Sequence, residues 1–428
     1  MNRYLQPKKE DWDVLLKRPT ATYAAIEPLV FEVFDRVQKE GDVAVNAYTQ
    51  KFDKISTQVK AIAPTDILAA EANISEALKT AIKLAQENIV CFHKAQKTAP
   101  VKVETQPGVH CWQEKRPIEK VGLYIPGGSA PLFSTLLMLA IPAKLAGCRE
   151  IVLCTPPDAA GKIPDVILYT ASLCGVDQIF AVGGIQAIAA MTFGTETIPG
   201  VYKIFGPGNQ FVTVAKQVAT RYQVAIDMPA GPSELLIVAD DSANPEFIAS
   251  DLLSQAEHGP DSQVLLVSLS EGLMEKVQLA IDVQLQALPR KDIAAQALAN
   301  SKMIYFSSDA EAITFINAYG PEHYIVCVKN EDKYLTQLVN AGSVFIGNYT
   351  PESAGDYASG TNHTLPTNGY AKQYSGVNLD SFLKAITFQK IDEKGIQKIG
   401  PAIELMAAAE GLEAHKNAVS LRLNSLKK

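Results

Sequence analysis

The stretch that decides the fold spans residues 121–154 and reads VGLYIPGGSAPLFSTLLMLAIPAKLAGCREIVLC. It opens with a short β-rich run at 121–125, passes through an apolar helical stretch at 132–147, and closes with a second β-rich run at 150–154. Strand, helix and strand in this order predict a βαβ unit, in which the two strands are parallel.

The same alternation continues as far as residue 346. Further strands are expected near 178–182, 202–205, 223–226, 234–239, 263–269, 303–306, 324–328 and 343–346. Helices are expected among them at 209–220, 245–257, 271–288, 309–318 and 332–340. Two prolines and a glycine in Met228-Pro229-Ala230-Gly231-Pro232 separate the first five strands from the second five. We therefore predict two α/β domains with mainly parallel sheets.

The two ends of the chain and one long loop follow other patterns. Apolar residues recur at helical spacing over 27–52 and 66–98, and short β-rich runs begin after Pro100. Residues 347–377 are polar and rich in Gly, Ser, Thr, Asn and Tyr, and a loop of this length in a compact domain is usually functional. Residues 378–428 are expected to be helical.

The composition argues against several classes of protein, namely nucleic-acid-binding, membrane-spanning and secreted proteins. With 428 residues the chain exceeds a usual single core, and its net charge of −7 argues against nucleic acid as the main partner. No stretch approaches the roughly 20 apolar residues of a membrane span, and the first residues lack the apolar core of a signal peptide. The six cysteines form no C-x-x-C pair and are expected to be reduced. A cytoplasmic location is expected.

Two short strings place an acid beside an imidazole next to a Gly-Pro break: Glu257-His258-Gly259-Pro260 and Gly320-Pro321-Glu322-His323. Gln255 precedes His258 by three residues at a predicted helix end, so both side chains lie on one face of the helix. Together they can present a carboxamide oxygen and an imidazole nitrogen to a cation. The alternative is a helix C-cap, where a histidine interacts favourably with the helix dipole.

Glu322 and His323 suit general base chemistry, one acting on water and the other on a hydroxyl proton. The alternative is a turn that carries a solvated glutamate.

Asp356 and His363 lie in the polar loop over 351–363, which suits substrate recognition or metal ligation. A flexible surface loop is the alternative reading of that segment.

Three glycine-rich turns follow predicted strands, at 124–128, 182–184 and 205–209. None has the G-x-G-x-x-G pattern, but turns at strand ends that open helices do bind phosphates, so a dinucleotide can bind here.

Glu410 and His415 lie in the predicted C-terminal helical segment. Five positions apart, they point about 140° away from each other, and their spacing gives neither of them a role.

Several of these motifs occur together in one known family. They are the segments 254–262 (SQAEHGPDS), 321–323 (PEH), 227–234 (DMPAGPSE), 205–209 and 354–363. In this order they resemble histidinol dehydrogenase, and the resemblance extends from about residue 20 to about residue 420. That family catalyses the last two steps of histidine biosynthesis. The resemblance therefore implies an NAD-dependent zinc enzyme that oxidises L-histidinol through histidinal to L-histidine.

The resemblance also implies roles for individual residues. One zinc ion per subunit would be bound by Gln255, His258, Asp356 and, from the partner subunit, His415. The acid–base residues would be Glu322 and His323. The substrate would contact the zinc ligands together with Ser233, His323, His363 and, from the partner subunit, Glu410. NAD would contact Tyr124, Gln186 and Asn209.

For the fold, the resemblance implies two incomplete Rossmann-like domains, one inserted in the other, with small helical terminal segments and a homodimer that shares its active sites. We expect an N-terminal helical segment at 1–20. A first α/β domain, with the metal and acid–base site, would comprise 21–124 and 231–377. A second α/β domain at 125–230 would bind NAD, and 378–428 would form a helical dimerisation segment.

We expect His323 to take the hydroxyl proton in the first oxidation and Glu322 to activate water before the second. Zinc cannot change its redox state, so the hydride must go to the nicotinamide. The residues alone are also compatible with two other functions. One is an NAD-dependent dehydrogenase acting on another small alcohol, and the other is a zinc hydrolase in which Glu322 activates water.

Overall fold

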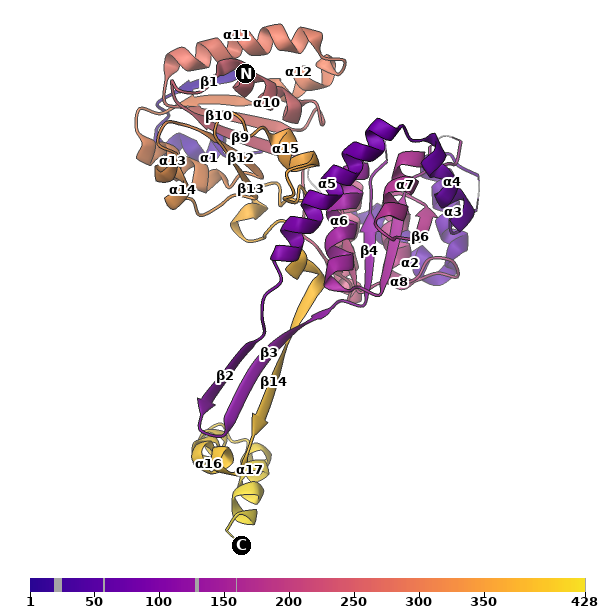
Figure 1. Ribbon diagram of the computed structural model, residues 1–428, viewed down its shortest axis with the longest axis vertical. Helices are drawn as coiled ribbons and strands as arrows, with labels where there is room; N and C mark the ends of the chain where they lie inside the picture. The colour runs from indigo at the N-terminus through magenta and orange to yellow at the C-terminus, as the bar shows by residue number, and fades with distance from the viewer. Residues whose placement is uncertain (19–24, 57, 128–130, 159, 428) are drawn as a thin grey trace.

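Two parallel sheets and a projecting arm make up the structure, a computed structural model that describes residues 1–18, 25–56, 58–127, 131–158 and 160–427 (Figure 1). The apolar runs of the sequence form the strands of both sheets. In the segment Leu235–Val238, for example, every side chain is fully buried. Such continuous burial is typical of parallel sheets that have helices on both faces.

The first lobe contains a six-stranded parallel sheet in the order β1-β11-β10-β9-β12-β13, and we call it the six-stranded lobe. Its strands are β1 (Asn2–Leu5), β9 (Glu234–Ala239), β10 (Gln263–Ser268), β11 (Lys302–Tyr305), β12 (His323–Cys327) and β13 (Ser343–Ile346). One face is covered by α10 (Pro245–Ala256), α11 (Glu271–Ala287) and α12 (Lys291–Ala299). The other is covered by α1 (Trp12–Leu15), α13 (Asp309–Tyr319) and α14 (Glu331–Thr336).

The second lobe contains a five-stranded parallel sheet in the order β6-β5-β4-β7-β8, and we call it the five-stranded lobe. Its strands are β4 (Lys120–Tyr124), β5 (Glu150–Thr155), β6 (Gln178–Ala181), β7 (Lys203–Phe205) and β8 (Ala225–Ile226). One face is covered by α4 (Pro64–Ala69), α5 (Glu76–Ala95), α6 (Phe133–Ala146) and α7 (Asp165–Leu173). The other is covered by α2 (Glu27–Glu40), α3 (Asp42–Asp53), α8 (Gly184–Phe193) and α9 (Gln210–Ala219).

The two sheets share one strand order. Counted from β9 in one sheet and from β4 in the other, both read 3-2-1-4-5, which is the Rossmann order without its last strand. The chain leaves the six-stranded lobe after α1 and returns to it at β9, so the five-stranded lobe is inserted. These observations confirm the predicted fold class of two incomplete Rossmann-like domains, one inside the other.

The arm is a three-stranded antiparallel sheet, β14-β3-β2, followed by two helices. Its elements are β2 (Val101–Gln106), β3 (Val109–Pro117), β14 (Leu383–Ile391), α16 (Glu393–Ala409) and α17 (Glu413–Ser425). Figure 1 shows that the arm extends away from both lobes and carries the C-terminus at its tip. All of β2 is exposed and α17 has no buried residue, so the arm has little core within one chain.

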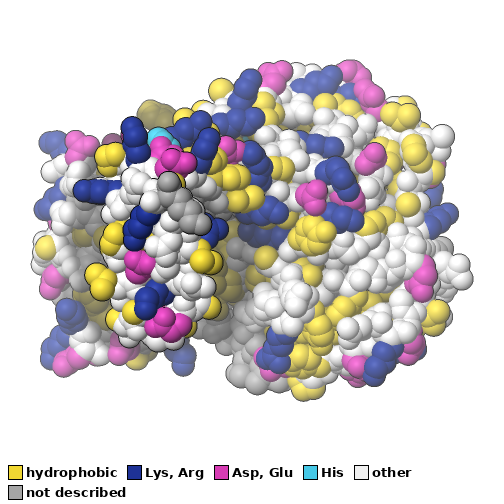
Figure 2. Space-filling model, turned by 90° about the horizontal axis from the view of Figure 1, so that it is seen from below, with side chains coloured by type: hydrophobic (Ala, Val, Ile, Leu, Met, Phe, Trp, Pro, Cys, Tyr) yellow, Lys and Arg dark blue, Asp and Glu magenta, His cyan; other side chains and the backbone are white. Residues whose placement is uncertain are grey.

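Apolar side chains lie on the surface of this arm. Leu405, Met406 and Leu421 are 73%, 66% and 63% exposed. Figure 2 looks toward the tip of the arm and shows hydrophobic side chains at its surface among the charged ones. Exposed apolar surface of this extent is typical of a segment that packs against another protein chain.

Three expectations from the sequence need correction. Residues 1–20 were expected to be helical, but Asn2–Leu5 form an edge strand paired with β11, followed by the short helix α1. Residues 378–428 were also expected to be helical, yet they include the nine-residue strand β14, which pairs with β3. Finally, the helices within 27–95 pack on the five-stranded sheet and not on the domain that contains 231–377, because their apolar faces complete its two cores.

The expected loop over 347–377 is largely irregular and contains the short helices α15 (Glu352–Tyr357) and η5 (Tyr370–Lys372). The other 3-10 helices are η1 (Lys9–Asp11), η3 (Ala70–Asn73), η4 (Thr220–Tyr222) and η6 (Leu379–Phe382). Among the described residues, every helix is too short or too polar to span a lipid bilayer.

A buried ion pair fastens the N-terminal segment to the six-stranded lobe. The guanidinium of Arg18 donates to Glu234 Oε2 at 2.7 Å and to the carbonyl oxygen of Tyr319 at 2.8 Å, and it stacks on the Tyr319 ring at 3.9 Å. The exposed fractions of the two charged side chains are 11% and 2%. Breaking such a pair from one side leaves a buried charge without compensation.

Replacing Arg18 by methionine is therefore expected to lower the free energy of unfolding of this lobe by about 3–5 kcal/mol. Denaturant unfolding followed by circular dichroism measures the change. Lys39→Met is the matched control, because it breaks the exposed pair of Lys39 and Asp35, whose side chains are 69% and 61% exposed. We expect no measurable change in that variant. An equal effect of both substitutions would contradict the structural role of the buried pair.

Candidate active site

A cleft of about 540 Å³ lies where the two lobes meet. The five-stranded lobe contributes the segments that follow β4, β7 and β8, at the carboxyl ends of its strands. The six-stranded lobe contributes Ser233, Ser262, Glu322 and His323, which precede or begin strands β9, β10 and β12. In the five-stranded lobe, the cleft lies at the carboxyl ends of the strands, where the strand order reverses, which is the usual ligand position in this fold. In the six-stranded lobe, the cleft lies instead at the amino-terminal ends of the strands.

On the five-stranded side, the turn at 206–209 leads from β7 into α9. Gly206 has φ +125°, and a Cβ there would collide with the carbonyl oxygen of Tyr124, so the turn requires glycine. The Asn209 side chain caps α9 by accepting hydrogen bonds from the amides of Phe211 and Val212. A buried lysine, Lys216, also donates to the Gly206 carbonyl at 2.8 Å. This rigid turn opens a helix N-terminus toward the cleft, an arrangement that favours anionic ligands.

On the six-stranded side, the end of α10 presents Gln255 and His258 to the cleft. Gln255 is 1% exposed, and both atoms of its carboxamide are buried without a hydrogen-bond partner among the described residues. Burying an amide in this state costs free energy, so an unpaired carboxamide facing a cleft indicates a place for a ligand. Burial lowers the pKa of the neighbouring His258, which favours the neutral imidazole that binds metal ions.

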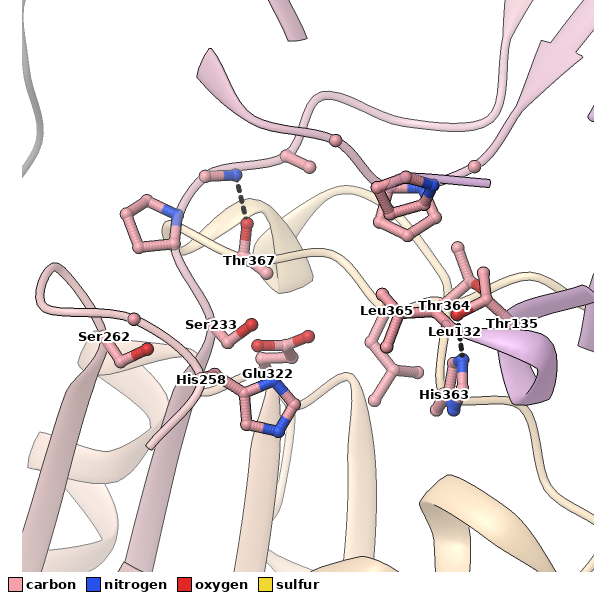
Figure 3. A pocket seen from close by; sticks show the side chains of 18 of the residues that line it. Leu132, Thr135, Ser233, His258, Ser262, Glu322, His363, Thr364, Leu365 and Thr367 are labelled. Atoms are coloured by element: carbon pink, nitrogen blue, oxygen red, sulfur yellow. Dashed lines mark hydrogen bonds between the residues drawn. The ribbon is translucent and has the colours of Figure 1, made fainter. Parts of the chain in front are cut away.

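The loop after β13 places Asp356 and His363 on the same cleft. Nδ1 of His363 lies 2.8 Å from the carbonyl oxygen of Asp356, and its Nε2 lies 3.1 Å from the hydroxyl of Thr135 on α6. Figure 3 shows His363 and Thr135 on one side of the cleft, with Ser233, His258 and Glu322 on the other. The loop therefore lies across the junction between the lobes.

A second set of contacts fastens this loop to the five-stranded lobe. The amide of the buried Asn362 donates to the carbonyl oxygen of Met138 at 2.6 Å and lies 3.3 Å from Nε2 of His93 on α5. Asn88, also on α5, donates to the carbonyl oxygen of Ala358 at 2.8 Å. The loop that follows Asp356 is thus held by the five-stranded lobe, whereas α15, which carries Asp356, packs on α10 of the six-stranded lobe, where Gln255 and His258 also lie.

Glu322 and His323 lie at the start of β12, buried at the base of the cleft. Oε2 of Glu322 accepts a hydrogen bond of 2.8 Å from the amide of Glu234. Nδ1 of His323 lies 3.3 Å from a carboxylate oxygen of Glu352, and Nε2 lies 3.7 Å from Oδ1 of Asp356. The ligand atoms of His323, Glu352 and Asp356 all lie within 4.8 Å of one another, close enough to hold a metal ion.

The close carboxylates set the proton affinities of this cluster. Burial raises the pKa of Glu322 to about 8, against the opposing effect of His323. Burial lowers the pKa of His323, but the charges of Glu352 and Glu322 outweigh it and raise the pKa to about 10. A carboxyl group whose pKa is raised toward neutral pH can take and return a proton during a reaction. The excess of carboxylates also favours a bound cation.

Comparisons with known proteins identify the family of this chain. A model of the histidinol dehydrogenase family matches residues 16–423. The chain belongs to the histidinol dehydrogenase family. It is 58% identical to the histidinol dehydrogenase of Bacteroides thetaiotaomicron and 52% identical to that of Salmonella typhimurium, with 98% of this chain covered in both cases and 98% and 96% of the relatives. It is therefore an oxidoreductase.

A solved histidinol dehydrogenase from Elizabethkingia anophelis has the same fold. It superposes with a TM-score of 0.98 at 56% sequence identity, covering 100% of this chain and 99% of that one. An aldehyde dehydrogenase from Bacillus cereus superposes with a TM-score of 0.50 at 16% identity, covering 90% of each chain. At that identity the second likeness concerns the fold alone.

Most of the residues that the histidinol dehydrogenase resemblance singled out line the cleft. They are Ser233, Gln255, His258, Glu322, His323, Asp356, His363 and Asn209. Tyr124 and Gln186 lie elsewhere, in a buried network at the ends of β4 and α8. The Tyr124 hydroxyl accepts from the amide of Gly184 at 3.1 Å, and Gln186 donates to Asp53 at 3.0 Å. Gly128, in the first glycine-rich turn, lies outside the described residues.

Glu410 and His415 do not line the cleft of their own chain. Glu410 ends α16 and His415 lies in α17, both exposed on the arm. Among the titratable residues around His323, the sequence analysis missed Glu352. Glu352 stands four positions before Asp356, one helical turn away, and that spacing is the signal that could have pointed to it.

Proposed function

We propose that this member of the histidinol dehydrogenase family oxidises L-histidinol through histidinal to L-histidine, using two NAD⁺ and one zinc ion per subunit. The observation that carries the proposal is the cleft itself. It brings the acid–base pair Glu322 and His323, three of the four expected metal ligands and the turn ending in Asn209 to one place. A site with these groups can bind a cation, abstract protons and hold a dinucleotide phosphate.

The residues present fit a zinc ion. Gln255 offers an unpaired carboxamide oxygen, Asp356 a carboxylate with a lowered pKa and His258 a neutral imidazole. When bound, zinc supplies a positively charged template for the substrate, and NAD⁺ supplies the hydride acceptor. The turn at Gly206, fixed by Lys216 and opening α9, offers the place for the dinucleotide.

In the first oxidation, the neutral ring of His323 takes the hydroxyl proton as a hydride leaves the carbinol carbon. A cation held by Asp356 would favour this neutral ring, because it offsets one of the carboxylate charges that raise the pKa of His323. In the second, Glu322 takes a proton from water, whose oxygen adds to the aldehyde, and a second hydride leaves the hydrate. The balance is one alcohol and one water converted to a carboxylate, with two hydrides and the accompanying protons released. Because both residues lie at the base of a single cleft, the aldehyde can stay bound between the two steps.

We also propose that the enzyme is a homodimer in which the arm of each subunit reaches the cleft of the other. The support is the position of Glu410 and His415 on an arm that has exposed apolar side chains and little core. His415 would then complete the metal site, and Glu410 and His363 would select a cationic imidazole substrate. All six cysteines are free, which is compatible with the proposed cytoplasmic location.

Chelation tests the metal requirement. Removing the metal with a chelator is expected to abolish NADH formation from histidinol, and adding zinc after removing the chelator is expected to restore it. NADH absorbance measures both. Full activity in a protein shown to be metal-free would contradict the zinc proposal. Because the same assay can be run with other small alcohols, it also separates the proposed substrate from the alternatives, and a hydrolase would form no NADH.

A further inference from the structure

No step of the proposed reaction uses Glu352, although its side chain lies beside His323. Its side chain is 2% exposed, and it begins α15 one turn before Asp356. Its Oε1 is buried, has no hydrogen-bond partner among the described residues, and lies 3.3 Å from Nδ1 of His323. Its Oε2 accepts a long hydrogen bond, 3.5 Å, from the hydroxyl of Ser254. A buried carboxylate is costly unless it is paired, and His323 is its closest cationic partner here.

The surroundings of His323 show which of its nitrogens carries the proton when the ring is neutral. Nδ1 lies 3.3 Å from the carbonyl oxygen of Glu234 and 3.3 Å from Glu352 Oε1. A carbonyl oxygen can only accept, so Nδ1 must be the donor. Nε2 has no hydrogen-bond partner among the described residues and lies on the side of Asp356, at 3.7 Å. Its lone pair is then available to a ligand in the cleft.

We propose that Glu352 is a positioning residue that keeps the proton of His323 on Nδ1 and thereby leaves Nε2 as the acceptor of the substrate's hydroxyl proton. The inference rests on the proposed function, in which His323 is the base. When Nε2 takes the proton, the ring becomes an imidazolium, and the carboxylate at 3.3 Å stabilises it. Glu352 thus acts on the reaction through His323 and does not touch the substrate.

Glu322 is less suited to this role, although it is adjacent. Its Oε2 lies 3.6 Å from Nδ1 of His323 and already accepts a hydrogen bond from the amide of Glu234. In the proposed reaction Glu322 itself gains and loses a proton, so it is not a fixed partner of the ring. Burial raises the pKa of the Glu352 carboxyl, and the positive charge of a protonated His323 at 3.3 Å opposes that rise, so the two groups stabilise each other in their charged forms.

The wild-type enzyme provides a direct test. In protein labelled with ¹⁵N-histidine, NMR distinguishes the protonated from the unprotonated ring nitrogen of a neutral imidazole, and the His323→Asn variant identifies the signals of His323 among the six histidines. We expect the proton on Nδ1 in the zinc-loaded enzyme. A neutral His323 with its proton on Nε2 would overturn the proposal without any variant of Glu352.

The Glu352→Gln variant then tests the effect on turnover. Its amide can donate to Nδ1 and favour the wrong tautomer, so kcat is expected to fall about 10–100-fold with KM within about twofold, and the NMR signals of His323 should shift toward Nε2 protonation. Ser353→Ala, at the exposed neighbour on α15, is the matched control and should leave both unchanged. An unchanged kcat in Glu352→Gln would overturn the proposal.

Two further readouts separate the remaining outcomes. Zinc content is expected to stay at the wild-type level in Glu352→Gln, and loss of zinc would make Glu352 a metal ligand and overturn the positioning role. If the wild-type enzyme formed no NADH from histidinol, the proposed function would fail, while the wild-type NMR spectrum would still decide whether Nδ1 carries the proton. Failure of one proposal is therefore distinguishable from failure of the other.

Discussion

Replacing His323 by asparagine is expected to lower the turnover number with histidinol by about 10²–10⁴-fold. Asparagine can keep a hydrogen bond to the Glu234 carbonyl, which lies 3.3 Å from Nδ1, but it cannot accept a proton at neutral pH. The loss should therefore fall on the chemical step. Steady-state formation of NADH measures kcat and KM separately.

Zinc content and thermal stability are the controls for this variant. His323 is not among the four proposed metal ligands, so the zinc content is expected to remain one per subunit. The melting temperature is expected to fall, because the buried Glu352 loses its cationic partner, but the protein should remain folded at the temperature of the assay. If His323→Asn kept near-normal turnover, another group would have to be the base. If it lost zinc, the imidazole would belong to the metal site together with Asp356, which lies 3.7 Å from it.

Much of the fold could be predicted from the sequence, because each strand of the two large sheets is a short apolar run between helices. Both faces of these sheets are covered, so strands such as β9 consist entirely of apolar residues after the first. The arm strand β14 gives no such signal. It is mostly exposed, and its partner β3 lies far away in the sequence, so only the three-dimensional pairing identifies it. The edge strand β1 has only four residues and is likewise mostly exposed.

The sequence pattern also does not predict which sheet the N-terminal helices pack against. Their apolar stripes predict helices, but a stripe does not indicate which sheet it covers. Val33 and Val45 of α2 and α3 complete one core of the five-stranded lobe, while Ile82 and Ile89 of α5 complete the other. The attachment of these helices therefore depends on contacts between residues that are distant in the chain.

The candidate site was predictable only in part. Gln255 and His258 share a helix turn, and Glu322 and His323 are neighbours, so local spacing identifies both pairs. Glu352 was missed because a glutamate in a polar loop looks solvated, and only the fold shows that it is buried against His323. For Glu410 and His415, local spacing indicates no function, which is the expected result for residues that act in another subunit.

Mixing two inactive variants is expected to restore activity if the sites are shared. In Glu322→Gln the defect lies in the cleft, and in His415→Asn it lies in the arm, so each homodimer has two defective sites. A mixed dimer has one site with both defects and one with neither. Random exchange makes about half of the dimers mixed, so about a quarter of the wild-type activity should return. Unfolding and refolding the two variants together, followed by the NADH assay, measures the recovery.

The control is a mixture of Glu322→Gln with His323→Asn. Both substitutions lie in the cleft at the start of β12, so every site of a mixed dimer keeps one defect and no activity should return. Recovery in the first mixture and not in the second identifies the arm as the donor of His415 to its partner. If neither mixture recovers, the arm acts within its own chain or has no role in the site. The exposed Leu405 and Met406 of α16 would then need another partner to cover them.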